Sequence, residues 1–290
     1  MAEYVITTDS TVDLGAERMQ QLDVQFATLK YLYRGEEFPD DMRDSSALKI
    51  YNAMRSGEVI TTSQVNPDQF VLLWSDLLAA GKDILYIGFS SGLSGTVNSA
   101  QIAKGQLQAQ YPDRKIYIVD SLCASGGEGM FLQHVLLKQK AGASIEECYA
   151  YAEGFKLRIN HWFTVSELSY LRRGGRVSAA AALFADILGI KPVMNMDDTG
   201  HLIPREKVKG RRTAIKRMFE HLTELADIED NPFFHITHAD CMEDAQYLKN
   251  MLCERFPNIP VNISMVGAVI GSHCGPGTLA LFFVGKPRTA

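Results

Sequence analysis

The sequence predicts an α/β fold with a largely parallel sheet, and two observations carry this prediction. Strand-like runs such as YVITT, ILYIGF and KIYIVD alternate with helical segments from the start of the chain, as is typical of strand–helix–strand units. The 290 residues are 46% hydrophobic and 22% charged, which is enough apolar mass for more than one core. We therefore expect two α/β domains.

Local signals assign the elements of the first half. The helix expected at 66–81 is the best marked, because Asn66 can cap it, Pro67 suits its first turn and Gly81 can close it. The other elements follow from the spacing of apolar residues. We expect strands at 4–8, 24–33, 58–62, 84–89 and 115–120, and further helices at 45–57 and 97–110.

The pattern of predicted strands and helices changes after a long helical stretch at 144–160, and we place a domain boundary at residue 158. The first domain is then 1–158 and the second is 159–290. No Pro/Ser-rich linker separates them, so we expect the two domains to pack closely. In the second domain we expect strands at 163–166, 192–196, 201–208, 233–239 and 261–266, two helices broken by Gly174 and Gly175, and helices at 210–227 and 241–256.

Composition and missing motifs argue against several classes of protein. A net charge of -5 and a pI near 5.8 give no reason to expect nucleic acid. No apolar run reaches the roughly 20 residues of a membrane span, and no secretory signal opens the chain, so we expect a cytoplasmic protein. Five scattered cysteines without a CxxC pair predict neither a disulfide framework nor a metal site. No dinucleotide, P-loop or GxSxG motif is present, so we expect no cofactor.

Two hydroxyl-rich segments each follow a predicted strand. The loop SSGLSG at 90–95 could cradle an anion or could simply cap the next helix. The segment TTSQ at 61–64 follows another strand, and ligands of α/β sheets bind at such strand ends. Together the two segments favour a small anion held between them. The acidic pairs Asp40–Asp41 and Asp197–Asp198 lie beside turn residues and are expected to face solvent.

Two further segments carry candidate functional groups. His273 stands among Gly271, Gly275 and Gly277 in a predicted tight turn, where it could be a donor, a general base or a metal ligand. Three arginines surround a diglycine break before a strongly apolar helix. That helix is either a buried core helix or the wall of an apolar cavity.

These segments, in this order, resemble the DegV family of bacterial fatty-acid-binding proteins, which serve as the binding subunit of fatty acid kinase. The resemblance spans nearly the whole chain. It rests on TDSTVDL at 8–14, TTSQVNPDQF at 61–70, SSGLSGTVNSA at 90–100, VDSLCASGGEG at 119–129, LSYLRRGGRVS at 168–178 and IGSHCGPGTLAL at 270–281.

The resemblance implies a lipid tunnel between two α/β domains that holds one long-chain fatty acid. At the matching positions, the carboxylate would be bound by Thr62, Ser94 and His273, with Ser63 and the backbone of Gly95 completing the network. We expect His273 to donate a hydrogen bond and to carry partial positive charge beside the carboxylate. For the acyl chain we expect a tunnel wall made of Leu183, Phe184, Ile187, Leu188 and Met194.

The resemblance also implies a partner, the ATP-binding subunit of fatty acid kinase, which phosphorylates the bound acid to an acyl phosphate for phospholipid synthesis. This chain would then be a carrier without catalytic residues, and lipid loading would involve transient membrane contact. For kinase docking we consider the basic residues Arg172, Arg173, Arg176, Lys207 and Lys209. Family members commonly have KVR where this chain has Lys207-Val208-Lys209, and valine replaces the common proline at Val65.

The sequence is also compatible with a second function. The chain could be an acyl hydrolase or transferase with Ser94 as nucleophile and His273 as base. The sequence identifies no carboxylate that would orient His273, and several equivalent hydroxyls suit binding better than nucleophilic attack.

Overall fold

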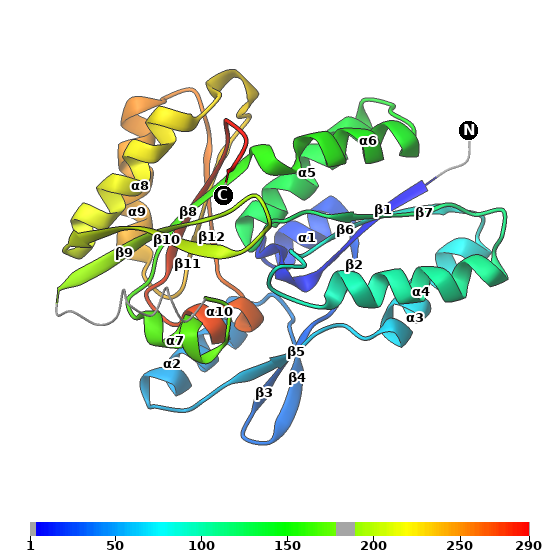
Figure 1. Ribbon diagram of the computed structural model, residues 1–290, viewed down its shortest axis with the longest axis horizontal. Helices are drawn as coiled ribbons and strands as arrows, with labels where there is room; N and C mark the ends of the chain where they lie inside the picture. The colour runs from blue at the N-terminus through cyan, green and yellow to red at the C-terminus, as the bar shows by residue number, and fades with distance from the viewer. Residues whose placement is uncertain (1–3, 178–188, 290) are drawn as a thin grey trace.

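The first half of the chain builds a four-stranded parallel sheet, as the strand–helix alternation predicts. The computed structural model describes residues 4–177 and 189–289, and in it the strands run in the order β2-β1-β6-β7. Helices α3 and α4 pack together on one face, and α6 covers the other (Figure 1). The strands are β1 (Tyr4–Asp9), β2 (Gln25–Ala27), β6 (Asp83–Gly88) and β7 (Ile116–Asp120), and the helices are η1 (Ser10–Val12), α1 (Ala16–Leu22), α2 (Asp44–Arg55), α3 (Pro67–Ala79), α4 (Thr96–Gln110), α5 (Gly126–Lys140) and α6 (Ile145–Phe155).

A small antiparallel sheet projects from this body (Figure 1). It consists of β3 (Lys30–Tyr33), β4 (Glu36–Pro39) and β5 (Thr61–Ser63) in the order β4-β3-β5. The single strand expected at 24–33 is therefore wrong, because β2 and β3 belong to different sheets. Between them, Leu29 is buried and bonds instead to the side chain of Ser10 and the backbone of Asp40.

The second half forms a six-stranded mixed sheet in the order β10-β9-β8-β13-β11-β12. Only the β11–β12 pair is parallel, so the expectation of a largely parallel sheet applies to the first half alone. Helix α5 packs on one face of this sheet, and α8 and α9 pack on the other. The elements are η2 (Lys156–Arg158), β8 (Ile159–Thr164), α7 (Leu168–Arg173), β9 (Ile190–Met196), β10 (Leu202–Lys209), α8 (Arg211–Leu225), η4 (Ile228–Asp230), β11 (Phe234–His238), α9 (Met242–Arg255), β12 (Val261–Met265), α10 (Ala268–Cys274) and β13 (Leu279–Val284).

Two helix predictions can be compared with the structure directly. Helix α3 begins with the predicted cap, since Asn66 and Gln69 exchange side-chain and backbone hydrogen bonds in a capping box. The helix expected at 144–160 is too long, because α6 ends at Phe155, the short 3-10 helix η2 follows, and β8 begins at Ile159.

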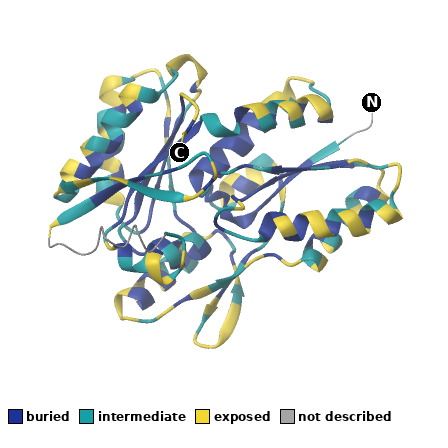
Figure 2. Ribbon diagram, viewed as in Figure 1, coloured by how far each residue is buried: buried dark blue, intermediate teal, exposed yellow. Residues whose placement is uncertain are grey.

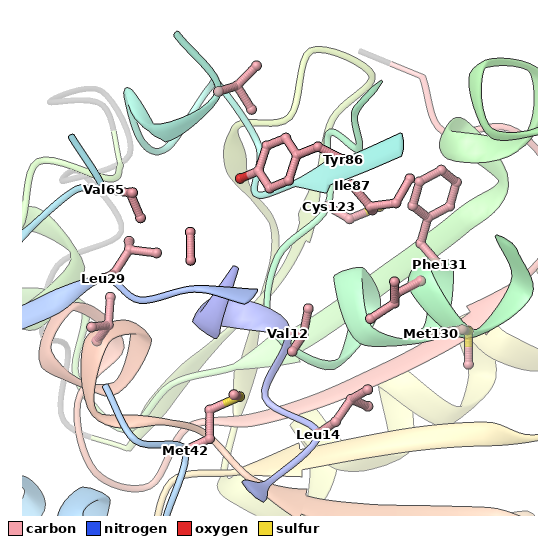
Figure 3. Packing of buried hydrophobic residues seen from close by; sticks show 14 of the residues in the cluster. Val12, Leu14, Leu29, Met42, Val65, Tyr86, Ile87, Cys123, Met130 and Phe131 are labelled. Carbon is pink, nitrogen blue, oxygen red and sulfur yellow. The ribbon is translucent and has the colours of Figure 1, made fainter. Parts of the chain in front are cut away.

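One hydrophobic core runs through both halves of the molecule. The cluster around Val12, Tyr86 and Phe131 (Figure 3) also contains Ala280 and Phe282 of β13. A second cluster lies between the six-stranded sheet and α8 and α9. Buried residues accordingly concentrate where the two halves meet (Figure 2). The halves pack closely, as expected, while the exact boundary at residue 158 stays a prediction.

The buried carboxyl of Asp40 contradicts the prediction that this acidic pair faces solvent. Asp40 is only 1% exposed, and its Oδ2 has no hydrogen-bond partner among the described residues. Burial raises the pKa of Asp40 to about 7. Asp197 is also partly buried, and its carboxylate accepts the N–H groups of Thr199 and His201 within a turn. Acidic residues next to a turn are therefore poor markers of exposure in this chain.

We predict that Asp40→Asn removes a pH-dependent loss of stability. A carboxyl whose folded pKa is raised loses stabilisation as pH rises from its ordinary value near 3.8 to the folded value near 7. Between about pH 4 and pH 7 the parent should lose up to about 4 kcal/mol at this site, and the variant should not. Urea unfolding at several pH values measures this difference. The neighbouring Asp41→Asn is the control, and a parallel pH dependence of parent and Asp40→Asn would contradict the prediction.

Candidate functional site

A largely apolar cavity lies between the two halves of the chain. Its empty space is about 1040 Å³, a figure that includes the open solvent at its mouth. Both halves contribute to its wall. The lining residues are Leu29, Thr62, Gln64, Phe89, Leu93, Ser94, Ala124, Ser125, His161, Phe163, Leu171, Arg176, Leu202, Thr237, Val266, Val269, Ile270, His273, Cys274, Thr278, Ala280 and Phe282.

Thr62 and His273 meet at one end of this cavity. The Oγ1 atom of Thr62, on β5, is 2.8 Å from Nε2 of His273. The tight turn expected around His273 is wrong, because this residue lies in the last turn of α10. The turn begins only at Gly275, whose φ of 78° suits glycine. The helix thus carries a histidine of the second half to a hydroxyl of the first half.

The serine loop, residues 90–95, supplies Ser94 to the same cavity. The Oγ atom of Ser94 is 2.9 Å from Oγ1 of Thr96 and also accepts the N–H of Thr96. The geometry of this loop is therefore compatible with both interpretations, a helix cap and an anion cradle. Ser94 satisfies a backbone donor at the start of α4, and it also lines the cavity. Gly95 precedes α4, and a Cβ there would overlap the amide of Gln64.

The side chain of Ser63 does not line the cavity. Side chains alternate between the two faces of a strand, so Thr62 and Ser63 on β5 point in opposite directions. Gln64, one step further along, returns to the face of Thr62 and lines the cavity. Its Nε2 donates to Oγ of Ser99. Strand alternation would have favoured Gln64 over Ser63 had the bounds of β5 been known.

Arg176 lies in the cavity wall, although the sequence grouped it with residues for partner docking. Its Nε donates to the carbonyl of Leu93 at 3.1 Å, and its Nη1 donates to the carbonyl of Gly174 at 2.5 Å. No carboxylate of residues 4–177 or 189–289 forms an ion pair with Arg176. Burial lowers the pKa of Arg176, but a guanidinium remains charged in proteins. Among the described residues, the polar end of the cavity therefore carries a positive charge that has no carboxylate partner.

The surroundings of His273 favour its neutral form. Burial, and then the nearby charge of Arg176, lowers its pKa to about 4. Its Nδ1 has no hydrogen-bond partner within the described ranges. The partial positive charge expected for His273 would therefore need a bound anion to stabilise it.

The described wall of the cavity includes residues that were not expected to form the tunnel wall. Leu183, Phe184, Ile187 and Leu188 lie outside the described residues. Met194 on β9 is fully buried in the core, beside Phe163, but is not among the lining residues given above. The wall is formed in part by alternate residues of two central strands, namely His161, Phe163, Ala280 and Phe282.

A second hollow lies outside the polar end and shares Thr62, Arg176 and His273 with the cavity. The rest of its lining is Met54, Val59, Ile60, Thr61, Tyr170, Arg173, Gly174 and Ser272. The polar end of the cavity thus has an outer side that is lined by a second arginine, Arg173. The remaining residues that were considered for docking the kinase are all exposed, namely Arg172, Arg173, Lys207 and Lys209.

Two negative findings concern the described residues alone. None of their helices is both long enough and apolar enough to cross a membrane. No three histidine, cysteine, aspartate or glutamate side chains among them are grouped in a way that could hold a metal ion.

The fold and the cavity together define an α/β protein of two packed halves with a ligand cavity at their junction. Residues 3–286 match the DegV family, described as "Uncharacterised protein, DegV family". A DegV domain-containing protein of Clostridium perfringens is 39% identical over 289 residues, which cover 99% of each chain. The chain belongs to the DegV family.

Two solved structures resemble this one closely. The structure of DegV from Bacillus subtilis, a fatty acid binding protein, has a TM-score of 0.85 at 28% identity and covers 99% of this chain and 100% of its own. A fatty-acid-binding DegV family protein from Thermus thermophilus has a TM-score of 0.87 at 25% identity, with coverage of 98% and 100%. These matches confirm the predicted fold and the predicted family.

We predict that the imidazole of His273 titrates far below its ordinary pKa of 6.5 when no ligand is bound. Since its pKa is lowered to about 4, its contribution to stability is complete above pH 6.5 and is lost as the pH falls toward 4. Nitrogen-15 NMR of the histidine rings, assigned with His273→Gln, measures this pKa. Addition of a long-chain fatty acid should raise it. A midpoint near 6.5 in the ligand-free protein would contradict this account.

We further predict that Gly174→Ala disturbs His273. Gly174 has an ordinary helical backbone, but a Cβ there would overlap Nδ1 of His273, so the ring would have to shift and its contact with Thr62 would change. Gly105→Ala is the matched control, because a Cβ at that helical glycine meets no atom within 4 Å. The nitrogen-15 shifts of His273 should change in the first variant and not in the second, and identical spectra would refute the contact.

Proposed function

We propose that this protein binds one long-chain fatty acid in the cavity, with the carboxylate at Thr62, Ser94, His273 and Arg176. The single observation that carries the proposal is a largely apolar cavity with a polar, positively charged end. The fatty-acid-binding proteins of Bacillus subtilis and Thermus thermophilus, which share the fold, support the same ligand class.

The acyl chain supplies most of the affinity in this proposal. At about 0.8 kcal/mol per buried CH₂ group, roughly 14 methylenes contribute on the order of 11 kcal/mol before ordering costs. A neutral hydrogen bond contributes only about 0.5–1.5 kcal/mol net. The polar residues therefore set the orientation of the acid more than they retain it.

The polar end suits a carboxylate that must still react. Thr62 and Ser94 offer hydroxyl donors, and a neutral His273 adds or accepts a single hydrogen bond. Arg176 compensates the negative charge, and two of its N–H groups are already used by the carbonyls of Leu93 and Gly174. It therefore does not need to form a bidentate clamp, which would occupy both carboxylate oxygens. One carboxylate lone pair is left for attack on a phosphoryl group.

We propose that a separate kinase subunit phosphorylates this carboxylate to an acyl phosphate. The family resemblance supports this partner, and the outer hollow beside Thr62 and His273 offers the phosphoryl group an approach. Exposed basic residues near the hollow and on β10 would dock the kinase, namely Arg172, Arg173, Lys207 and Lys209. In this proposal the protein is a cytoplasmic carrier without cofactor that feeds phospholipid synthesis and contacts membranes transiently to load lipid.

The geometry argues against a hydrolase that uses Ser94 and His273. The hydroxyl of Ser94 interacts with Thr96, and Nε2 of His273 faces Thr62 instead of Ser94. In a serine hydrolase, the base contacts the nucleophile and a carboxylate orients the base. Nδ1 of His273 meets no such group among the described side chains.

The proposal is tested by extracting the purified protein and identifying bound lipid by mass spectrometry. We expect one long-chain fatty acid per chain. Thr62→Val keeps the shape of the side chain and removes its hydroxyl, so affinity for palmitate or oleate should fall by only about 3- to 10-fold. Ser63→Ala, on the opposite face of β5, should bind like the parent. Absence of bound lipid, together with no binding of added fatty acid, would refute the function.

A further inference from the structure

Arg288, close to the end of the chain, has a buried guanidinium. It is 6% exposed, and no acidic side chain of the described residues forms an ion pair with it. Its Nε also lacks a hydrogen-bond partner there. Burial lowers the pKa of its guanidinium. A buried charge is costly unless its neighbours compensate it, so the groups that Arg288 contacts must compensate its charge.

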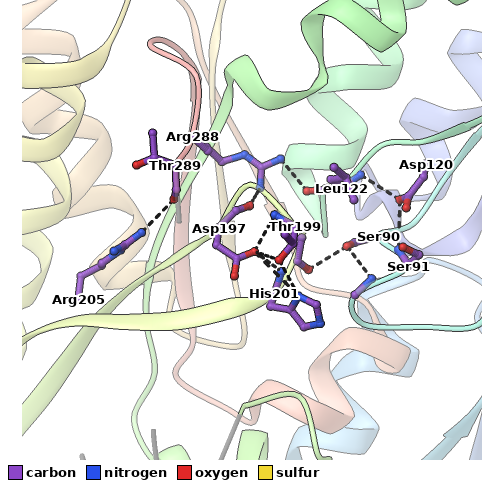
Figure 4. Close-up of polar contacts among 12 residues, drawn as sticks. Ser90, Ser91, Asp120, Leu122, Asp197, Thr199, His201, Arg205, Arg288 and Thr289 are labelled. Carbon is purple, nitrogen blue, oxygen red and sulfur yellow. Dashed lines mark hydrogen bonds and ion pairs between the residues drawn. The ribbon is translucent and has the colours of Figure 1, made fainter. Parts of the chain in front are cut away.

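The guanidinium of Arg288 binds backbone carbonyls from three separate segments. Nη1 donates to the carbonyl of Asp197 at 2.8 Å, in the turn between β9 and β10. Nη2 donates to Leu122 at 2.7 Å, in the loop after β7, and more weakly to Lys156 at 3.4 Å, before β8. Figure 4 shows the first two contacts. One side chain thus joins the end of the chain to both of its halves.

The first two of these segments lead directly to the cavity. The β9–β10 turn accepts a hydrogen bond from the Oγ atom of Ser90 through the carbonyl of Gly200, at 2.8 Å (Figure 4). Gly92 lies so close to this turn that a Cβ would come within 2.7 Å of the same carbonyl. Ser90 and Gly92 belong to the serine loop that carries Leu93 and Ser94. On the other side, the Leu122 loop continues to Ala124 and Ser125, which also line the cavity.

An apolar contact spans the same junction. Phe89 and Leu93 of the first half pack with Met196 of the second in a small cluster of their own, with Leu202 and Ala124 beside them. All of these except Met196 line the cavity. The β9–β10 hairpin is therefore part of the cavity wall. The hydrogen bonds of Arg288 and Ser90 hold its turn in place.

We propose that Arg288 is a positioning residue for the ligand cavity, which holds the β9–β10 turn and the Leu122 loop against the serine loop and thereby limits ligand release. Three carbonyl dipoles take the place of a carboxylate, so the contact depends on the fork of the guanidinium and not on a charge pair. The inference rests on the proposed function, because its main consequence is the rate at which the fatty acid leaves.

The test compares Arg288→Ala and Arg288→Lys with Arg205→Ala. Arg205 is an exposed control that binds Asn195 and the carbonyl of Thr289 in the same tail. Each protein is loaded with the fluorescent fatty acid cis-parinaric acid, and its transfer to excess albumin is followed by stopped flow. We expect release to be at least about tenfold faster in Arg288→Ala, and methylguanidinium should slow it again. The control should release at the parent rate.

Hydrogen exchange provides a second measurement that needs no ligand. In Arg288→Ala, exchange should accelerate at residues 90–95 and 197–201 and stay unchanged in α8 and α9. Should this variant fail to fold, Arg288→Lys takes its place and should show a smaller change in the same segments. The proposal would be overturned if a folded variant released the fatty acid and exchanged its amide hydrogens like the parent. It would also be overturned if hydrogen exchange accelerated uniformly over the chain and methylguanidinium did not slow the release. If the parent binds no fatty acid, the proposed function fails and exchange alone decides the role of Arg288.

Discussion

The hydrogen bond between Thr62 and His273 constrains much of the remaining structure. It joins the edge of the small sheet to α10, and so it ties the first half of the chain to the second at the polar end of the cavity. Helix α10 reaches this position because its glycines allow close packing. Gly271 lies against Tyr51 of α2, and Gly275 lies against Tyr170 of α7. The polar end of the cavity therefore depends on the fit of three helices.

Charge is distributed unevenly around the cavity, because burial neutralises the imidazole of His273 but leaves the guanidinium of Arg176 charged. His273 is neutral because burial penalises its cation, and Arg176 strengthens this effect. Arg176 keeps its own charge and has no carboxylate partner among the described residues. A bound carboxylate would complete the pair and shift the protonation of His273 upward. Ligand charge and protein charge are complementary in this account, and the apolar walls make the interaction stronger than it would be in water.

The sequence predicted some parts of the site well and others not at all. The strand ends before Thr62 and Ser94 predicted that their segments lie together, whereas the place of His273 beside them came only from the family resemblance; all three residues line the cavity. The position of Arg176 in the wall could not be predicted, since it depends on how α7 packs against α10. The burial of Asp40 and the break between β2 and β3 likewise arise from contacts between distant segments. Local patterns do not encode such contacts.

The central claim is the orientation of a fatty acid in the cavity. The structure offers hydroxyls away from the Thr62 end as well, because Ser125 and Thr237 are hydrogen-bonded to each other in the wall. A crystal structure with palmitate tests the claim most directly. We expect the carboxylate within hydrogen-bonding distance of Thr62 and Ser94, with the chain between the two halves. A carboxylate at Ser125 and Thr237, or a cavity left without ligand at saturating palmitate, would contradict the account.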